Sequence, residues 1–279
     1  MPEVPTNGQL VLLVLAILAF AAGGVVSLSR LWWDRGALRL IAKSAMYVGI
    51  SLSAAVLIWH GADRGSWIPL EDNFDAFIWL AVLLAIFVQY VQRSKPLGGL
   101  EWFVMPIVIV LLVAAGVFGK GKPHEYADGL WEWTHRVSSF GGLFAFFIAG
   151  VAGVMYLIKQ NQLRSKHTTA AGPKLGSLER LEHITYSSVT LGFALLTIGL
   201  VTGLVRVLTH SKTNLGVNWY TNPKVLLAFS VWVVYAIVLH APINPTFRGR
   251  KAAILSVCGL FLVLGTLVAV QYVPSGGQH

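Results

Sequence analysis

The sequence predicts an all-α fold, a polytopic membrane protein in which eight transmembrane helices form one bundle. Hydrophobic residues make up 56% of the 279 positions, charged residues make up 12%, and the mean hydropathy is +0.68. This composition is too apolar for a soluble domain and is typical of polytopic membrane proteins. No segment between the apolar stretches is long enough to fold separately, so we expect a single integral membrane domain over residues 1–279.

Eight apolar stretches are each long enough, at about 17–25 residues, to cross a bilayer as a helix. Only Glu3 is charged before the first stretch, so this stretch lacks the basic segment of a signal peptide, and its apolar core is too long for one. The seventh stretch begins at Pro223, and proline is well tolerated at the first position of a helix. The predicted spans are residues 10–28, 45–61, 74–92, 102–119, 136–158, 185–208, 223–241 and 251–272.

The basic residues predict which connections face the cytoplasm, because Lys and Arg are enriched in cytoplasmic loops. The connections after the first, fifth and seventh stretches are basic, whereas the connection after the second carries four acids against Arg64 alone. Both termini are therefore expected outside, together with the connections after the fourth and sixth stretches. The net charge of +9 has the same origin, so we expect membrane lipid and no nucleic acid as a partner. The basic residues are Arg30, Arg35, Arg39 and Lys43, then Lys159, Arg164, Lys166, Lys174 and Arg180, then Arg248, Arg250 and Lys251.

The sequence excludes several classes of chemistry. Cys258 is the single cysteine, which excludes an internal disulfide, a cysteine-ligated metal cluster and covalent haem attachment through CxxCH. The phosphate-binding GxxxxGK[ST] motif, the HExxH motif and the nucleophile elbow are absent. No carboxylate lies in the middle of a predicted span, although a proton or ion pump normally has one. We therefore assign no catalytic residue.

An aromatic loop joined to a histidine-terminated apolar helix, LGVNWYTNPKVLLAFSVWVVYAIVLH over residues 215–240, points to a planar, metal-containing ligand. Loops between membrane helices seldom carry tryptophan unless it lies at an interface or contacts something flat. Histidine is the usual axial ligand of haem iron, so the ligand predicted is haem b. Trp219 and Tyr220 would form a stacking platform, with an interfacial aromatic belt as the alternative. Lys224 would pair with a propionate or extend to the lipid headgroups.

Three histidines at the ends of predicted spans are candidate haem ligands. His135 follows two tryptophans and opens the fifth span, and the alternative for it is an interfacial residue that hydrogen-bonds to water or headgroups. His240 ends the seventh span, where a polar group at membrane depth tends to be functional unless it reaches the interface. His60 ends the second span and is expected to be interfacial.

The remaining histidines carry less weight when they are considered one by one. His279 is the last residue of the sequence, and a terminal histidine is usually frayed. His183 is expected to cap or line a cytoplasmic interface at the start of the sixth span. The other three lie in loops and are expected to be solvated; they are His124, His167 and His210.

Several segments resemble the CcsA/ResC cytochrome c assembly proteins and their HemX relatives, within the haem-handling superfamily that includes the CcmC and CcmF proteins. The resemblance covers most of the chain, and its sharpest part is GF-x-LLT-x-G-x-x-TG, residues 192–203. The other matching segments are PLEDNFDAF (69–77), the histidine-led helix from 134 to 157, the inner loop and helix start from 175, WVVYAIVLH (232–240) and RGRKAA (248–253).

The resemblance implies a set of ligand positions. In that family an outward tryptophan-rich loop, the WWD domain, holds haem between two flanking histidines, and further histidines lie within the membrane. His135 matches the first flanking histidine, His279 falls at the place of the second, and His240 matches an intramembrane one. The resemblance therefore implies His135 and His279 as axial ligands of the haem iron. The distribution of Lys and Arg among the connections, which uses no family knowledge, also places His135 and His279 outside.

The loop itself departs from the family pattern, which reads roughly WGxxWxWDPKE. Gly216, Trp219, Pro223 and Lys224 match it. Four other positions differ, which removes two stacking tryptophans and both acids: Leu215, Thr221, Asn222 and Val225.

The resemblance implies a haem-handling component of cytochrome c maturation in the bacterial inner (cytoplasmic) membrane. It would present haem at the outer face for attachment to apocytochrome c, with a membrane partner of the cytochrome c synthesis system. Any enzymatic role would be as part of a cytochrome c haem lyase (synthetase) complex. Two alternatives stay open: a HemX-like membrane regulator of haem biosynthesis, and a haem-free structural or assembly subunit.

Overall fold

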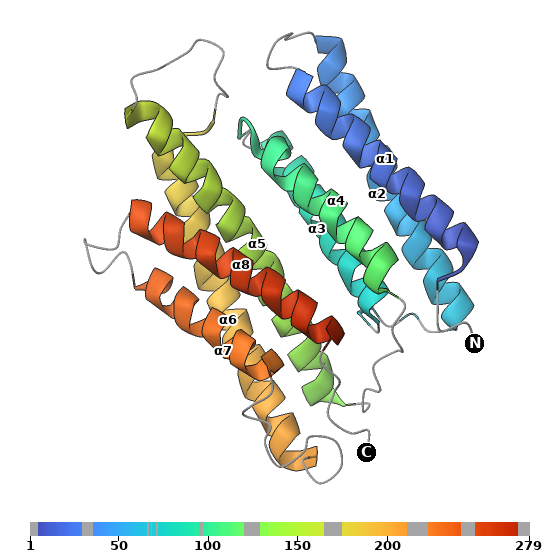
Figure 1. Cartoon of the computed structure of the whole chain (residues 1–279), viewed down its shortest axis with the longest axis vertical. Helices are drawn as coiled ribbons and strands as arrows, with labels where there is room; N and C mark the ends of the chain where they lie inside the picture. Colours follow the sequence, from blue (N-terminus) through green and yellow to red (C-terminus); the bar gives the residue numbers. More distant parts are fainter. Residues whose placement is uncertain are drawn as a thin grey trace. The chain divides into compact units, whose positions relative to one another are not determined.

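The computed structural model describes residues 5–29, 36–65, 67, 69–70, 72–94, 97–119, 129–164, 175–210, 223–240 and 249–272. These residues form eight α-helices, and no strand occurs among them (Figure 1). Six of the helices are long and apolar enough to cross a membrane. The predicted all-α, polytopic membrane class is therefore confirmed. The helices are α1 (Asn7–Ser29), α2 (Gly36–Arg64), α3 (Asn73–Ser94), α4 (Leu100–Phe118), α5 (Leu130–Arg164), α6 (Leu178–His210), α7 (Pro223–Leu239) and α8 (Arg250–Tyr272).

Each predicted span corresponds to one helix, but α2, α5 and α6 are longer than predicted. α5 has 35 residues, or about 52 Å at 1.5 Å per residue, which exceeds the roughly 30 Å of bilayer hydrocarbon. The extra turns are polar, as in KQNQLR at the end of α5. The structure thus corrects the assignment of several basic residues to loops, because they lie within helices: Arg39, Lys43, Arg64, Lys159, Arg164, Arg180, Arg250 and Lys251. Hydropathy detects only the apolar part of a helix, whereas backbone hydrogen bonds continue through polar turns.

The chain divides into two compact units. The first unit comprises Met1–Glu125 and Lys166–Gly176 and contains α1 to α4. Within it α1 packs against α2 and α4, and α3 packs against α4 and α2. Phe20 of α1 is fully buried over Gly49 of α2, where a Cβ atom would lie 2.9 Å from the phenyl ring. The indole Nε1 of Trp102 in α4 donates to the carbonyl oxygen of Ser27 in α1 at 3.1 Å.

The second unit comprises Tyr126–Ser165 and Ser177–His279 and contains α5 to α8. Here α5 packs against α6 and α8, while α7 packs against α8 and α6. The ring of Tyr235 in α7 is fully buried and stacks on Phe146 of α5, with centroids 3.7 Å apart and planes 5° from parallel. The prediction of one integral membrane domain and the assignment of the membrane faces both stay predictions.

Candidate functional site

His135 lies in the second turn of α5, and its ring is held by the backbone of α6. The Nδ1 atom is 2.7 Å from the carbonyl oxygen of Gly199, so Nδ1–H donates this hydrogen bond. In a neutral imidazole the other nitrogen, Nε2, then keeps its lone pair. Metal-ligating histidines commonly show this arrangement, because the second hydrogen bond fixes the tautomer and the ring orientation. His135 therefore has the donor chemistry of an axial haem ligand.

Two glycines of α6 allow this close approach of the helices. A Cβ atom on Gly203 would lie 2.9 Å from Cε1 and 3.1 Å from Nδ1 of His135. A Cβ atom on Gly199 would lie 2.5 Å from the hydroxyl oxygen of Ser139 in α5. Both glycines belong to the GF-x-LLT-x-G-x-x-TG segment. The segment that carries the sharpest resemblance is therefore the one that positions His135.

Aromatic side chains surround the start of α5. Trp131 and Trp133 are both exposed, and the guanidinium of Arg136 lies 5.4 Å from the centroid of the Trp133 ring. Exposed tryptophans at a helix end agree with the aromatic-belt interpretation of this pair. This interpretation of the tryptophans does not exclude a ligand role for His135, because the ring of His135 faces α6 and is not part of the exposed aromatic pair.

His240 lies at the opposite end of the second unit from His135. It directly follows α7, is exposed, and its Nδ1 donates to the carbonyl oxygen of Ala236 at 2.7 Å. α7 runs parallel to α5, so the end of α7 and the start of α5 lie at different ends of the unit (Figure 1). The structure therefore does not bring His135 and His240 together.

The other predicted site residues lie wholly or partly outside the described residues. Trp219 and His279 are outside them, as are Leu215, Thr221 and Asn222 of the loop. Lys224 is the second residue of α7, but its side chain is not among those described. Their roles toward haem stay predictions.

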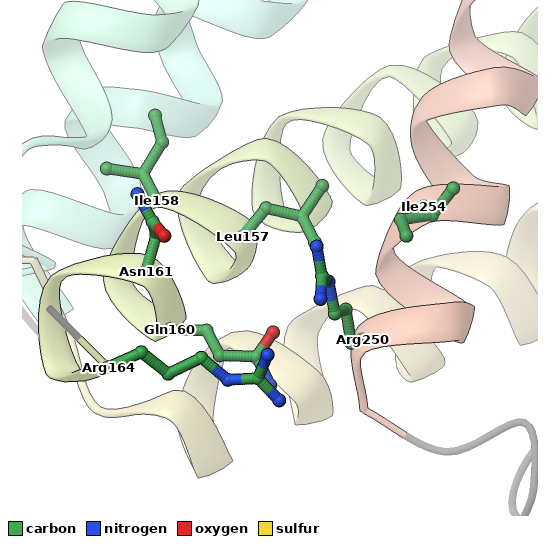
Figure 2. Close-up of a pocket in the computed structure, with 7 residues that line it drawn as sticks. All are labelled: Leu157, Ile158, Gln160, Asn161, Arg164, Arg250 and Ile254. Carbon is green, nitrogen blue, oxygen red and sulfur yellow. The ribbon is translucent and has the colours of Figure 1, made fainter.

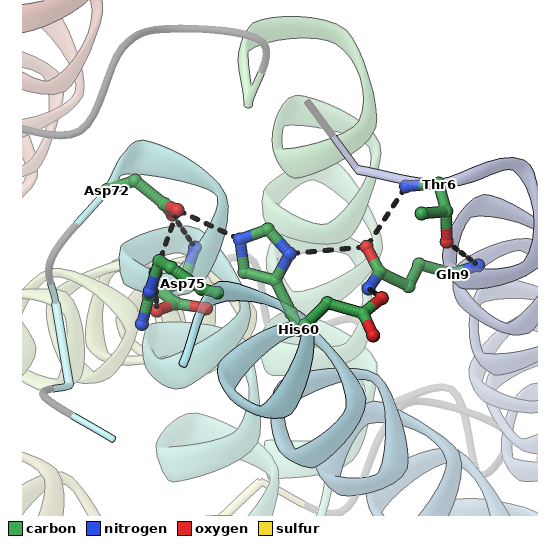
Figure 3. Close-up of polar contacts among 7 residues, drawn as sticks. Thr6, Gln9, His60, Asp72 and Asp75 are labelled. Carbon is green, nitrogen blue, oxygen red and sulfur yellow. Dashed lines mark hydrogen bonds and ion pairs between the residues drawn. The ribbon is translucent and has the colours of Figure 1, made fainter. Parts of the chain in front are cut away.

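The first unit contains a buried polar cluster that the sequence analysis did not predict. It joins Gln9 of α1 and His60 of α2 to Asp72 and Asp75 at the start of α3 (Figure 3). All four residues are buried. His60, expected to be interfacial, is only 5% exposed, because α1 and α3 supply partners for both of its ring nitrogens.

Asp72 is the central residue of this cluster. Its Oδ2 atom lies 2.9 Å from His60 Nε2 and 2.9 Å from Arg64 Nη1. Its Oδ1 atom accepts the backbone N–H of Asp75 at 2.7 Å and so caps α3. Burial acts to raise the pKa of Asp72, but the hydrogen bonds from His60 and Asp75 and the charges of His60 and Arg64 together lower it below its ordinary value of 3.8. The carboxylate is therefore ionised and bound on both sides.

The remaining contacts show how the charges are balanced. Arg64 Nη1 also binds Asp75 Oδ2 at 2.8 Å, so one guanidinium nitrogen bridges both carboxylates. Gln9 Nε2 donates to Asp63 at 2.9 Å, which turns its carbonyl oxygen toward His60 Nδ1 at 3.2 Å. The two ring nitrogens of His60 thus face two oxygen atoms, Gln9 Oε1 and Asp72 Oδ2. Ligand atoms of His60, Asp72 and Asp75 lie within 4.8 Å of one another, but Arg64 already binds one oxygen of each carboxylate.

Local signals in the sequence point to part of this cluster. His60 and Arg64 are four residues apart, a spacing that puts both on one helix face. Asp72 precedes α3 and Asp75 follows three residues later, which resembles a capping box. Nothing local indicates the partner in α1, because Gln9 lies 51 residues from His60.

Comparison with known proteins places the chain among membrane assembly proteins. Residues 67–276 match the family described as Cytochrome C assembly protein. The chain is 34% identical to the cytochrome c biogenesis protein CcsA of Prochlorococcus marinus (strain SARG), covering 97% of this chain and 93% of the relative. It is 29% identical to CcsA of P. marinus (strain NATL2A), covering 88% and 77%, and 21% identical to CcsA of Guillardia theta, covering 84% and 85%. No solved structure matches the chain. Because the family match spans most of its length, the chain belongs to the cytochrome c assembly protein family.

Proposed function

We propose that this protein handles haem during cytochrome c maturation and presents it at the outer membrane face for attachment to apocytochrome c. The observation that carries the proposal is the hydrogen bond from His135 Nδ1 to the Gly199 carbonyl, which leaves Nε2 for iron. The relatives named cytochrome c biogenesis protein CcsA support the same process.

The proposed site uses residues from both ends of the second unit's sequence. His135 and His279 would hold the haem iron, Trp219 would hold the porphyrin by stacking, and Lys224 would pair with a propionate. His240 is a second, intramembrane contact for haem on its route. The bound haem b supplies the vinyl groups that form thioether bonds with the cysteine thiols of the apocytochrome. The protein binds and orients it, and the Gly199 carbonyl keeps His135 in one tautomer.

The proposal includes a particular placement in the membrane. All eight helices span it, α7 and α8 included, and both termini lie outside, so that His135 and His279 share the outer face. The membrane is the bacterial inner (cytoplasmic) membrane. The partner is a further membrane protein of the cytochrome c synthesis system, and together they form the haem lyase complex.

An absorption spectrum of the detergent-purified protein, oxidised and dithionite-reduced, tests the proposal together with a pyridine haemochrome assay. We expect a near-stoichiometric b-type signal that is strongly reduced in His135→Ala. The matched control is His183→Ala, which removes an exposed histidine of α6 with no proposed ligand role. Equal haem content in the wild type and the His135 variant would overturn the proposal.

A second candidate function is a HemX-like membrane regulator of haem-synthesis enzymes that holds no haem. The loop favours it at Leu215, Thr221, Asn222 and Val225, which lack the aromatic and acidic groups of the family pattern. Under this function, deletion alters the level of an early haem-synthesis enzyme while cytochromes c stay normal. Absence of haem from the purified protein, even with excess haem precursor during expression, would favour this function over the first.

A further inference from the structure

A pocket of about 320 Å³ lies in the second unit, between the last turns of α5 and the first turn of α8. Its polar lining comes from Gln160, Asn161 and Arg164 of α5 and from Arg250 of α8. Figure 2 shows Arg164 extending from α5 toward α8, and Arg250 extending from α8 toward α5. The lining contains two guanidinium groups, two amides and no carboxylate. Such a pocket attracts an anion.

The two arginines have no counter-ion within the described part of the chain. Both side chains are exposed, and neither guanidinium group forms a hydrogen bond or an ion pair with another described residue. Arg64 differs from them, because its guanidinium binds two carboxylates. Two like charges in one pocket repel each other unless a bound anion compensates them. Arginine also binds phosphate oxygens through paired N–H groups.

The backbone adds to the positive potential. Arg250 is the first residue of α8, a helix of 23 residues, and Gly249 before it has a positive φ of 65°. The first N–H groups of a helix lack intrahelical acceptors, and the helix dipole is positive at this end. The carbonyl of Gly249 accepts the N–H of Ala253, so α8 begins at the pocket itself.

The apolar part of the lining identifies the class of anion. Leu157 and Ile158 of α5 and Ile254 of α8 line the same pocket. Leu157 and Ile158 close the apolar part of α5, and the residues that follow up to Arg164 are polar except for the exposed Leu163. The pocket therefore lies where the apolar part of α5 ends, which is where the boundary between hydrocarbon and headgroups is expected, and both apolar side chains and arginines line it. A soluble anion would contact only the arginines, whereas a phospholipid would contact both the arginines and the apolar side chains.

We propose that this pocket binds the phosphate headgroup of an anionic phospholipid. The part of an acyl chain next to the headgroup would lie against Leu157 and Ile254. The basic connections predict that this end of the unit faces the cytoplasm, where the leaflet is rich in anionic lipid. The site holds the long helix α5 to α8 at the membrane surface. It is separate from the proposed haem site, since His135 lies at the other end of α5.

Native mass spectrometry of the full chain tests this proposal, with phosphatidylglycerol and phosphatidylcholine as probes. We expect wild-type protein to retain phosphatidylglycerol preferentially, and the double variant Arg164→Gln, Arg250→Gln to bind it at least about tenfold more weakly, since it loses the charged hydrogen bonds from the two guanidinium groups to the phosphate. The matched control is Arg39→Gln, Arg93→Gln, which removes two exposed arginines from the same predicted face. This control should retain the wild-type preference.

A charge-conserving variant distinguishes a loss of lipid binding from a loss of folding. The variant Arg164→Lys, Arg250→Lys keeps the positive charges but loses the paired N–H groups, so its binding should lie between that of the wild type and that of the glutamine variant. Equal losses in the pocket and control variants, or no loss in either, would overturn the proposal. Inorganic phosphate in large excess should not displace the lipid; full displacement would show that the pocket binds free phosphate instead of a lipid.

Discussion

The Nδ1 atom of His135 and the carbonyl oxygen of Gly199 are 2.7 Å apart, so a side chain of α5 is oriented by the backbone of α6. A backbone acceptor cannot be removed by substitution, and it moves only if α6 moves. The tautomer of His135 is therefore tied to the packing of the two helices. Substitutions that change this packing should affect the histidine without altering it chemically.

The variant Gly203→Ala tests this link. Its new Cβ atom would lie 2.9 Å from Cε1 of His135, so the ring or α6 must shift and the hydrogen bond to Gly199 is strained. We expect haem affinity to fall by about tenfold to a hundredfold, the usual effect of losing an outer-shell partner. Haem titration followed by absorption measures this change. Gly265→Ala is the control, because nothing lies within 4 Å of its added Cβ atom.

Removal of His60 should destabilise the first unit. The change His60→Ala leaves Asp72 and Gln9 buried without one hydrogen-bond partner, and each such loss costs about 1–3 kcal/mol in the free energy of unfolding. Denaturant unfolding in detergent, followed by tryptophan fluorescence, measures this loss. Arg39→Gln serves as the control, because Arg39 is an exposed residue of the same helix outside the cluster, and its substitution should cost less than about 1 kcal/mol. Similar losses in both variants would argue against a stabilising role for the buried cluster.

The stability of the protein should depend on pH through Asp72. Its pKa in the folded protein lies below the ordinary value of 3.8, so the ionised carboxylate stabilises the folded state above that value. This contribution is lost as the pH falls through the lowered pKa. We expect the thermal midpoint to fall between about pH 5 and about pH 2, and to fall less steeply in Asp72→Asn. An equally steep fall in this variant would assign the acid sensitivity to other groups.

The hydrogen bond from the Trp232 indole to a hydroxyl group of α6 should stabilise the folded protein. Its Nε1 donates to Thr197 Oγ1 at 3.0 Å, and Thr197→Val leaves this donor without that acceptor. We expect a loss of about 1–2 kcal/mol in the free energy of unfolding. Thr190→Val is a close control, because both hydroxyls donate to the carbonyl four residues earlier but only Thr197 accepts from a tryptophan. A difference within experimental error between the two variants would contradict this assignment.

The sequence was sufficient to predict the eight helices, because an apolar run of bilayer length has few other interpretations. It was insufficient for the polar turns of α2, α5 and α6, which hydropathy does not distinguish from loops. For the site, hydropathy and family pattern selected His135, but its partner Gly199 lies 64 residues away. Only the packing of two helices reveals that contact.

The polar cluster was missed for a related reason. The charge count treated Arg64, Asp72 and Asp75 as loop charges that face water, and this interpretation is correct for isolated groups. In the structure they pair with one another and with His60, so that both aspartates are buried and Arg64 is only partly exposed. Net charge does not report such pairing, because it sums the residues without their contacts.

The cluster also bears on how the chain enters a membrane. His60 and Arg64 end one apolar helix, and Asp72 and Asp75 begin the next, so the hairpin tip carries its own counter-ions. A helical hairpin that forms before insertion would bring these groups together, and its tip would cross the hydrocarbon with its charges paired. Substitutions in the cluster would then reduce the yield of inserted protein during synthesis, before the stability of the finished protein comes into play.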